Sequence, residues 1–339
     1  MPRALVVGCS DTALTDGERR FLADADPLGV ILFARNVADP AQVRALVAEI
    51  RSVLGRDDAP ILIDQEGGRV QRLGPPHWRA VPAPARFGEL AATGFAGAVS
   101  AAQLNARVMA AELADLGITV ACTPVLDVPA PDGHAVIGDR ALARDPNTAG
   151  ELGAAVCTGL LRGGVLPVIK HLPGHGRARA DSHVALPSVA ADAAALAAHD
   201  FEPFARNAEA PWGMTGHVLY TAWDSANPAT TSAAVIRSVI RAQIGFDGVL
   251  VSDDLEMGAL AGDLRDRAEA AIGAGCDAVL QCSGALDAME RAAEGTPMLG
   301  DAAARRVADA EARRRAACDG GVEPVTARAR LAALLGEPG

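Results

Sequence analysis

Apolar and polar positions along this chain alternate between two kinds of segment. Short apolar runs, typical of buried strands, are followed by longer stretches with apolar residues at helical spacing. Fully apolar runs between helices indicate a parallel sheet that is covered on both faces. There are eight such runs, at 4–7, 29–33, 60–63, 119–126, 165–169, 212–215, 248–251 and 277–280.

The intervening stretches predict helices, and no linker rich in Pro, Gly or Ser divides the chain. Eight strand–helix units fit a closed barrel, a fold of about 250 residues that tolerates insertions. We therefore predict an α/β fold, a single (β/α)8 TIM-type barrel domain over 1–339 with a helical extension from about 286. An open doubly wound sheet is disfavoured because no GxGxxG turn follows the first run. The expected helices cover 15–26, 40–54, 89–116, a segment ending at 161, 191–209, 233–244 and 264–274.

Polar residues follow five of the apolar runs. In a parallel barrel the carboxyl ends of the strands meet on one face, where active sites are built. An Asp in such a position often only caps the next helix. Five polar residues, including the only lysine of the chain, favour a functional site instead. They are Asp64, Asp127, Lys170, His217 and Asp253.

The segment 168–183, VIKHLPGHGRARADSH, concentrates the candidate chemistry: it holds the single lysine and three of the seven histidines. An ammonium on a flexible stem differs from a guanidinium fork, so its retention in an Arg-rich chain favours a role for Lys170. Asp181 and His183 stand two apart, which suits a proton shuttle, although a structural ion pair is the alternative. Asp253 suits a carboxylate nucleophile, while Asp254 either shares that role or caps a helix.

Composition narrows the function further. The net charge is −11 with a pI of about 5.1, which does not suit nucleic acid. The Arg-rich segment 305–315 is interspersed with Ala, Asp and Glu and predicts a solvated helix. The six cysteines form no CxxC pair, which favours reduced, mostly buried thiols in the cytoplasm over disulfides or zinc. The chain shows neither a signal-peptide pattern nor an apolar run of about 18 residues. We expect a cytoplasmic monomer without nucleic-acid or membrane partners.

Several segments, taken together and in order, resemble glycoside hydrolase family 3, and within it the bacterial cytosolic β-N-acetylglucosaminidases of peptidoglycan recycling. The combination of KHLPGHG with DSH is the most specific part. The matching segments span roughly 4–285: GVILFARN (29–36), IDQEGGRVQRL (within 61–73), PVLDV (124–128), IGDR (137–140), KHLPGHG (170–176), DSH (181–183) and SDDLEM (252–257).

The resemblance implies a retaining double displacement on muropeptides within one catalytic domain, with no cofactor and no metal. It implies Asp253 as the nucleophile and His183 as the general acid/base with Asp181 as its partner. A His in this role departs from the carboxyl pair of most retaining glycosidases. The residues implied to hold the N-acetylglucosamine unit are Asp64, Arg72, Arg140, Lys170 and His171.

Three alternatives remain open. A zinc-dependent barrel hydrolase is disfavoured because the HxH pair of such barrels is missing and Lys170 would repel a cation. A non-catalytic sugar-binding protein would have little need of both Asp253 and the Asp181–His183 pair. A phosphorylase would use phosphate in place of water, and a His acid/base would not repel that anion. Arg177 and Arg179 add positive charge to the loop before DSH.

Overall fold

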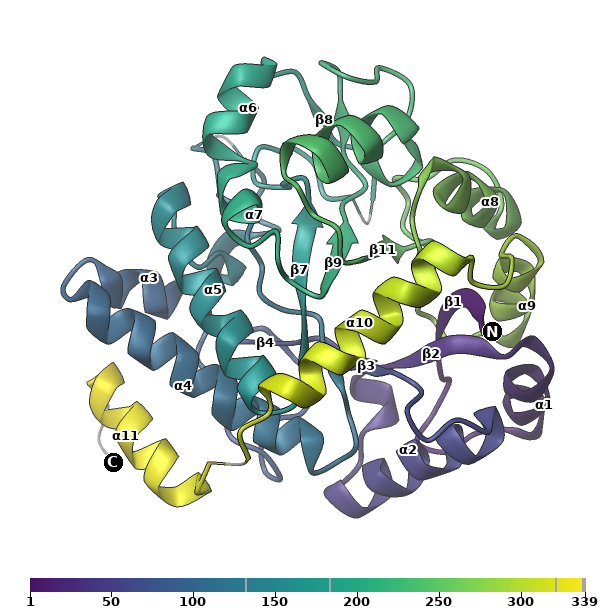
Figure 1. Cartoon of the computed structure of the whole chain (residues 1–339), viewed down its shortest axis with the longest axis horizontal. Helices are drawn as coiled ribbons and strands as arrows, with labels where there is room; N and C mark the ends of the chain where they lie inside the picture. Colours follow the sequence, from purple (N-terminus) through teal and green to yellow (C-terminus); the bar gives the residue numbers. More distant parts are fainter. Residues whose placement is uncertain (132, 183, 321, 337–339) are drawn as a thin grey trace.

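The computed structural model describes residues 1–131, 133–182, 184–320 and 322–336. It contains a closed barrel of parallel strands, which confirms the (β/α)8 prediction (Figure 1). Each of the eight expected apolar runs contains or overlaps a barrel strand. In order around the barrel, the strands are β1 (Arg3–Gly8), β2 (Pro27–Leu32), β3 (Ile61–Ile63), β6 (Val120–Ala121), β7 (Leu166–Leu172), β9 (Trp212–Thr215), β11 (Val249–Asp254) and β12 (Ala278–Gln281).

Strand β1 shows why the barrel strands consist mainly of apolar residues. Ala4 and Val6 face the barrel interior, where they join the core that fills it. Leu5 and Val7 alternate with them and pack in the outer layer between strands and helices. Since successive side chains of a strand point to opposite faces and both faces are buried, no polar position is left in the strand after Arg3.

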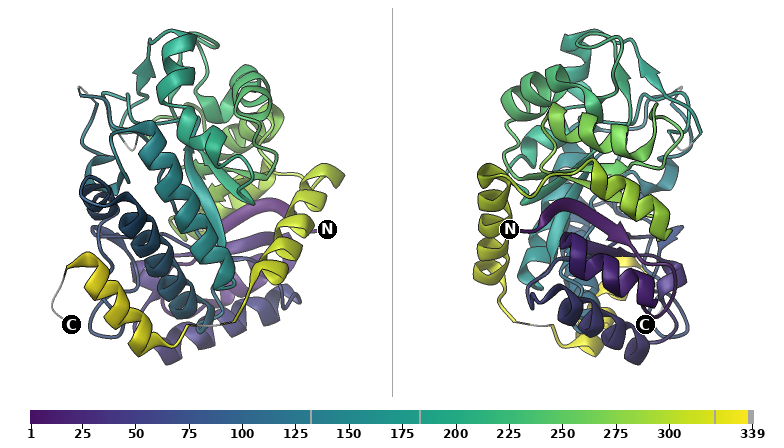
Figure 2. Two further views of the ribbon diagram at one scale, coloured as in Figure 1. Left: turned by 60° about the vertical axis from the view of Figure 1, so that its left-hand side comes forward. Right: turned by 90° about the vertical axis from the view of Figure 1, so that its right-hand side faces the viewer.

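Helices surround the barrel and cover the outer faces of the strands (Figures 1 and 2). Local sequence sets their ends: Thr15 and Glu18 form a capping box at the start of α1, and Asp39 caps α2 through two backbone N–H groups. Such caps contribute about 1 kcal/mol each. These helices are α1 (Asp16–Ala25), α2 (Pro40–Leu54), α3 (Ala85–Ala91), α4 (Phe95–Ala114), α5 (Pro146–Arg162), α6 (Ala193–His199), α7 (Glu202–Arg206), the π-helical η4 (Val235–Gln243), α8 (Leu264–Ala274) and α9 (Leu286–Glu294).

Two of the expected helices are each divided in two. The stretch 89–116 contains a break at Gly94, between α3 and α4, where a glycine costs about 1 kcal/mol relative to alanine in a helix. The stretch 191–209 divides into α6 and α7. Pro203 lies in the first turn of α7, where its missing N–H is tolerated; further along a helix it would remove a hydrogen bond.

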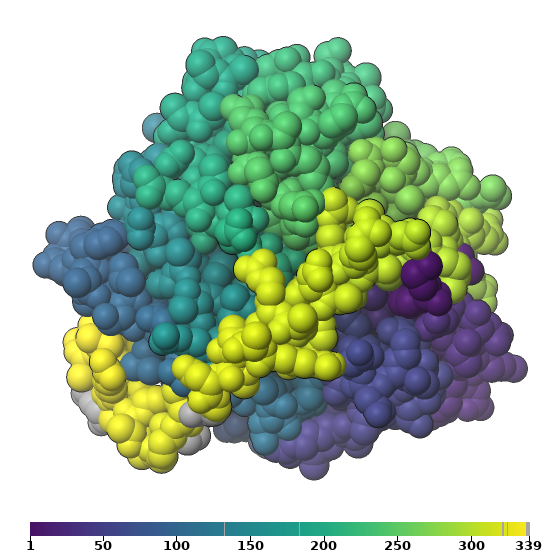
Figure 3. Space-filling model, viewed as in Figure 1, coloured from purple at the N-terminus to yellow at the C-terminus, as the bar shows by residue number. Residues whose placement is uncertain are grey.

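One of the two last helices closes the amino end of the barrel. Helix α10 (Asp301–Ala317) contains the Arg-rich segment and lies across this face, as Figures 1 and 3 show. Ala303 and Ala310 of α10 join the barrel core, while Arg306 pairs with Asp277 at 3.0 Å. Helix α11 (Pro324–Leu335) packs against α4 instead. Because α10 covers the amino end, a functional site is expected at the carboxyl end of the barrel.

Short elements lie in the loops between the strands and helices. The hairpin of β4 and β5 precedes Arg72, and η2 contains Arg140. Within the described part of the chain, no helix has the length and apolar character needed to cross a membrane. The short elements are η1 (Ala34–Asn36), β4 (Gln65–Gly67), β5 (Val70–Gln71), η2 (Gly138–Arg140), β8 (Ser188–Val189), β10 (Leu219–Tyr220) and η3 (Ala229–Thr231).

Candidate active site

A cavity of about 330 Å³ opens at the carboxyl end of the barrel. It brings together side chains that are far apart in the sequence, as the prediction from strand ends requires. One part of its wall is apolar and includes Phe33, Met214 and Met257. Its charged and polar lining comprises Asp64, Glu66, Arg69, Arg72, Arg140, Lys170, His171, Asp181, Asp253 and Asp254.

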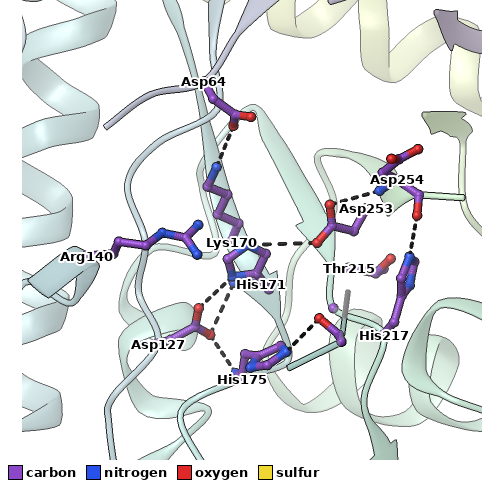
Figure 4. Close-up of polar contacts among 12 residues, drawn as sticks. Asp64, Asp127, Arg140, Lys170, His171, His175, Thr215, His217, Asp253 and Asp254 are labelled. Atoms are coloured by element: carbon purple, nitrogen blue, oxygen red, sulfur yellow. Dashed lines mark hydrogen bonds and ion pairs between the residues drawn. The ribbon is translucent and has the colours of Figure 1, made fainter. Parts of the chain in front are cut away.

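Lys170 is the centre of a buried cluster of charges on one side of the cavity. Its Nζ lies 2.7 Å from Oδ1 of Asp64 and 2.7 Å from Oε1 of Glu66. Arg140 binds the two oxygens of Glu66 at 2.8 Å each, in the bidentate geometry typical of guanidinium–carboxylate pairs. Figure 4 shows Lys170 reaching from β7 toward Asp64, with Arg140 beside it. The single lysine is thus the link between two carboxylates.

The cluster keeps its members ionised. Burial alone would raise the pKa values of Asp64 and Glu66, but Lys170 and the neighbouring arginines lower both of them. Burial alone would lower the pKa of Lys170, but the two carboxylates raise it. Because every charge has a partner of opposite sign, these groups hold fixed hydrogen-bonding directions without changing protonation.

Further contacts hold Arg72 and the loop that contains Arg140. The guanidinium of Arg72 lies 3.2 Å from Oδ2 of Asp64 and 5.5 Å from the centre of the Phe33 ring. Arg69 pairs with Asp139 at 2.7 Å and binds the carbonyl oxygen of Val136 at 2.6 Å. Arg69 therefore fixes the loop that contains Arg140. The five residues expected to hold a sugar all line one cavity.

His171 is oriented by a carboxylate behind it. Asp127 is fully buried, and its Oδ2 lies 2.6 Å from Nδ1 of His171. Burial would raise the pKa of Asp127, but His171 and His175 lower it, so the group is a carboxylate that only accepts. The proton of the His171 ring is therefore on Nδ1, and Nε2 points toward Asp253, 4.0 Å from its Oδ2 (Figure 4). Asp127 acts on the cavity through His171, because it does not line the cavity itself.

Asp253 is the last but one residue of β11 and lines the cavity. Burial would raise its pKa, but His171 and His217 lower it, and the N–H of Asp254 donates to its Oδ1 at 2.8 Å. Asp253 is therefore an ionised carboxylate that faces a ligand-sized space. Burial raises the pKa of the adjacent Asp254 to about 6.

His217, expected at the barrel mouth, is buried and absent from the cavity wall. Its Nε2 donates to the carbonyl oxygen of Asp254 at 2.9 Å, and its Nδ1 lies 2.7 Å from Oγ1 of Thr230. Burial lowers its pKa, so the ring is neutral near pH 7. His217 therefore holds the carboxyl end of β11 in place through the backbone of Asp254.

The loop after β7 closes one side of the cavity. Asp181 lines the cavity, whereas His183 lies outside the described residues. Position 176 requires glycine because a Cβ there would lie 1.9 Å from the carbonyl oxygen of Val128. His175 is neutral because burial lowers its pKa to about 4.

The zinc alternative would need several His and Asp side chains at one point, and the part of the chain that the structure describes has no such group. His171 uses Nδ1 for Asp127, and both ring nitrogens of His217 have protein partners. No three described His, Cys, Asp or Glu side chains form a metal-binding group.

Glu66 is the functional residue that sequence reasoning missed as part of the cluster. Its side chain is fully buried between Arg140 and Lys170. A signal was available: Glu66 is two residues after Asp64, a spacing that places both side chains on one face of extended backbone. A carboxylate held by two cations does not suit a proton donor.

An ionised aspartate facing a set of charged hydrogen-bonding groups, at the carboxyl end of a barrel, is typical of an enzyme that cleaves glycosidic bonds. The chain belongs to glycosyl hydrolase family 3, whose N-terminal domain profile matches residues 6–313.

Individual relatives agree with this family assignment. The β-hexosaminidase of Chromobacterium violaceum is 43% identical over 288 residues, which cover 84% of this chain and 80% of that protein. The structure of NagZ from Neisseria gonorrhoeae in complex with N-trifluoroacetyl-D-glucosamine is similar with a TM-score of 0.86 at 33% identity. That match covers 99% of each chain. A family 3 β-N-acetylglucosaminidase from Paenibacillus sp. str. FPU-7 has a TM-score of 0.86 at 29% identity, covering 98% of this chain and 67% of that one.

Proposed function

We propose that this protein is a retaining exo-β-N-acetylglucosaminidase that removes terminal N-acetylglucosamine from the non-reducing end of muropeptides. The observation that carries the proposal is the position of Asp253, an ionised carboxylate 4.0 Å from His171 across the cavity from the Lys170 cluster. The similarity to β-hexosaminidases and to an enzyme bound to a glucosamine derivative supports the choice of sugar.

In the first step, Asp253 attacks the anomeric carbon and forms a covalent ester with it. The bond to the leaving oxygen breaks, and His183 gives that oxygen a proton. In the second step, His183 takes a proton from water, whose oxygen attacks the same carbon and releases Asp253. Two inversions at one carbon give net retention. Asp181 orients the His183 ring and stabilises its charged form.

The sugar hydroxyls bind the Lys170 cluster in this proposal. Asp64 and Arg72 keep 17% and 27% of their side-chain surface exposed, so they are open to a ligand. Lys170, at 3%, and Glu66, at 0%, lie behind them and hold them in place. Hydrogen bonds from charged groups are roughly twice as strong as neutral ones, which suits recognition of hydroxyls. His171, held by Asp127, presents Nε2 between the cluster and the nucleophile.

The test is product analysis with a β-linked N-acetylglucosaminyl disaccharide, with and without phosphate. Free N-acetylglucosamine that first appears as the β-anomer, at a rate independent of phosphate, is the expected result. An α-anomer formed first would reject the retaining mechanism. A sugar 1-phosphate formed at the expense of free sugar would mean that phosphate resolves the intermediate.

We further propose that the whole chain is one catalytic domain that acts on muropeptides in the cytoplasm. The packing of α10 on the barrel core supports this reading, because removal of α10 would expose apolar side chains at the amino end. A truncation after α9 should therefore be insoluble or inactive, and fractionation of cells should recover the activity with cytoplasmic markers.

A further inference from the structure

Ser182 is fixed at two points, although residues 184–186 are exposed. Its Oγ lies 3.1 Å from Nε2 of His175, and its carbonyl oxygen accepts the N–H of Ala259 at 3.1 Å. Only 4% of Ser182 is exposed, in contrast to 78% of Val184 two residues later. The loop is therefore attached to the protein interior at the residue between Asp181 and His183.

The partner of Ser182 is itself firmly held. The backbone N–H of His175 donates to Oδ1 of Asp127 at 2.6 Å, and its ring packs edge-on against His171, with 5.9 Å between ring centres. Asp127 also holds the His171 ring, which faces Asp253. One buried carboxylate thus binds both the ring next to the nucleophile and the backbone of the residue that binds the loop (Figure 4).

The contact between His175 and Ser182 is the main polar contact of that ring. Nδ1 of His175 has no hydrogen-bond partner among the described residues, and the ring is 4% exposed. Because the ring is neutral, it offers one N–H and one lone pair, and the hydroxyl of Ser182 pairs with Nε2 in either tautomer. Loss of the hydroxyl would leave both ring nitrogens buried without partners, which is unfavourable.

We propose that His175 and Ser182 form a latch that fixes the segment of the chain to which the proposed acid/base pair, Asp181 and His183, belongs. The inference rests on the proposed function of that pair. Neither latch residue lines the cavity, so both are positioning residues that act through their neighbours. A small displacement of a proton donor is costly, since a 1 Å error in position costs about 10²-fold in rate.

The test is Ser182→Ala, measured on two substrates that differ in leaving group. With a disaccharide, kcat/KM should fall about 10–100-fold, because bond cleavage there needs a well-placed acid. With a nitrophenyl glycoside, formation of the glycosyl-enzyme should stay within about twofold, since that leaving group needs little protonation. Slow hydrolysis of the glycosyl-enzyme should then produce a burst of nitrophenol. Labelling of Asp253 by an activated 2-fluoro donor should keep its wild-type rate.

A second variant checks the other half of the latch. His175→Phe keeps an aromatic ring but lacks nitrogen, so it should reproduce the pattern of Ser182→Ala. The double variant should be no worse than the poorer single variant, because both remove the same contact. Ser182→Thr retains a hydroxyl and should recover most activity on the disaccharide. Ser188→Ala, an exposed serine of the same segment, should have wild-type kinetics on both substrates.

Equal losses on both substrates, or none on either, would overturn the latch. So would slow labelling of Asp253 in Ser182→Ala, because it would point to general damage of the barrel end. Failure of the wild-type protein to be labelled at Asp253 would reject the proposed function, and the inference with it. The two failures are therefore distinguished by the wild-type labelling experiment.

Discussion

Asp253 and Asp254 are adjacent carboxyl groups whose pKa values shift in opposite directions. Both are buried. For Asp253, the nearby His171 and His217 outweigh burial and lower the pKa, whereas for Asp254 burial dominates and raises the pKa to about 6. Pairs of acids separated in this way are typical of sites where the two groups have different tasks. Asp253 is available as a nucleophile over a wide pH range.

The first prediction assigns the nucleophile. Asp253→Ala should abolish turnover because no carboxylate then forms the ester, while Asp254→Ala should leave a measurable fraction. A 2- or 5-fluoro glycosyl donor should label Asp253, as read by mass spectrometry of peptides. A label on Asp254, or on neither residue, would reject the assignment.

The second prediction concerns stability and pH. The folded protein binds the Asp254 proton more tightly than the unfolded chain does. This group therefore stabilises the fold below about pH 4, and the contribution is lost as pH rises through about 6. Asp254→Asn removes the titration but keeps an oxygen for the N–H groups of Glu256 and Cys282.

Urea unfolding of both proteins between pH 4 and pH 6 measures this effect. The stability of wild type relative to the variant should fall with rising pH, by at most about 1.4 kcal/mol per pH unit. A difference that stays constant over this range would show that Asp254 has an ordinary pKa.

The third prediction separates substrate binding from protein stability in the Lys170 cluster. Arg72→Ala should weaken substrate use strongly and leave stability almost unchanged, because its guanidinium is partly exposed. Lys170→Ala should also impair substrate use, with the fold retained by circular dichroism. It should in addition lower the free energy of unfolding by about 3–5 kcal/mol, since it removes the buried cation that Asp64 and Glu66 share.

Kinetics with the disaccharide and denaturant titrations measure the two effects. The matched control is Arg44→Ala, which removes an exposed pair with Asp115 far from the cavity and should change neither. Near-normal activity of Lys170→Ala would mean that the single lysine has only a structural role.

The fourth prediction identifies the acid/base. General acid–base catalysis contributes about 10²–10⁴-fold, so His183→Ala should lose that factor on a sugar leaving group. On an activated nitrophenyl glycoside, the first step should be nearly spared and a burst should precede slow turnover. Asp181→Ala should show a milder form of the same pattern. Equal losses on both substrates would mean that His183 is not the proton donor.

The sequence alone was sufficient for the architecture and for most of the lining of the site. Burial of both strand faces leaves continuous apolar runs such as 165–169, and a closed barrel brings their carboxyl ends together, so Asp64, Lys170 and Asp253 could be grouped in advance. The breaks within helices were harder to predict from the sequence, because the division of 191–209 depends on where Pro203 is tolerated.

Tertiary structure decided what each charged group does. Glu66 and Arg140 are 74 positions apart, and Asp127 and His171 are 44 apart. Periodicity describes only near neighbours, so neither pairing could be read from it. The same holds for the lowered pKa of Asp253, which depends on His171 of β7 and on His217, which follows β9. The apolar pattern determines where the backbone goes because burial is a property of each position. Protonation and orientation depend on which charges meet, and barrel closure decides that.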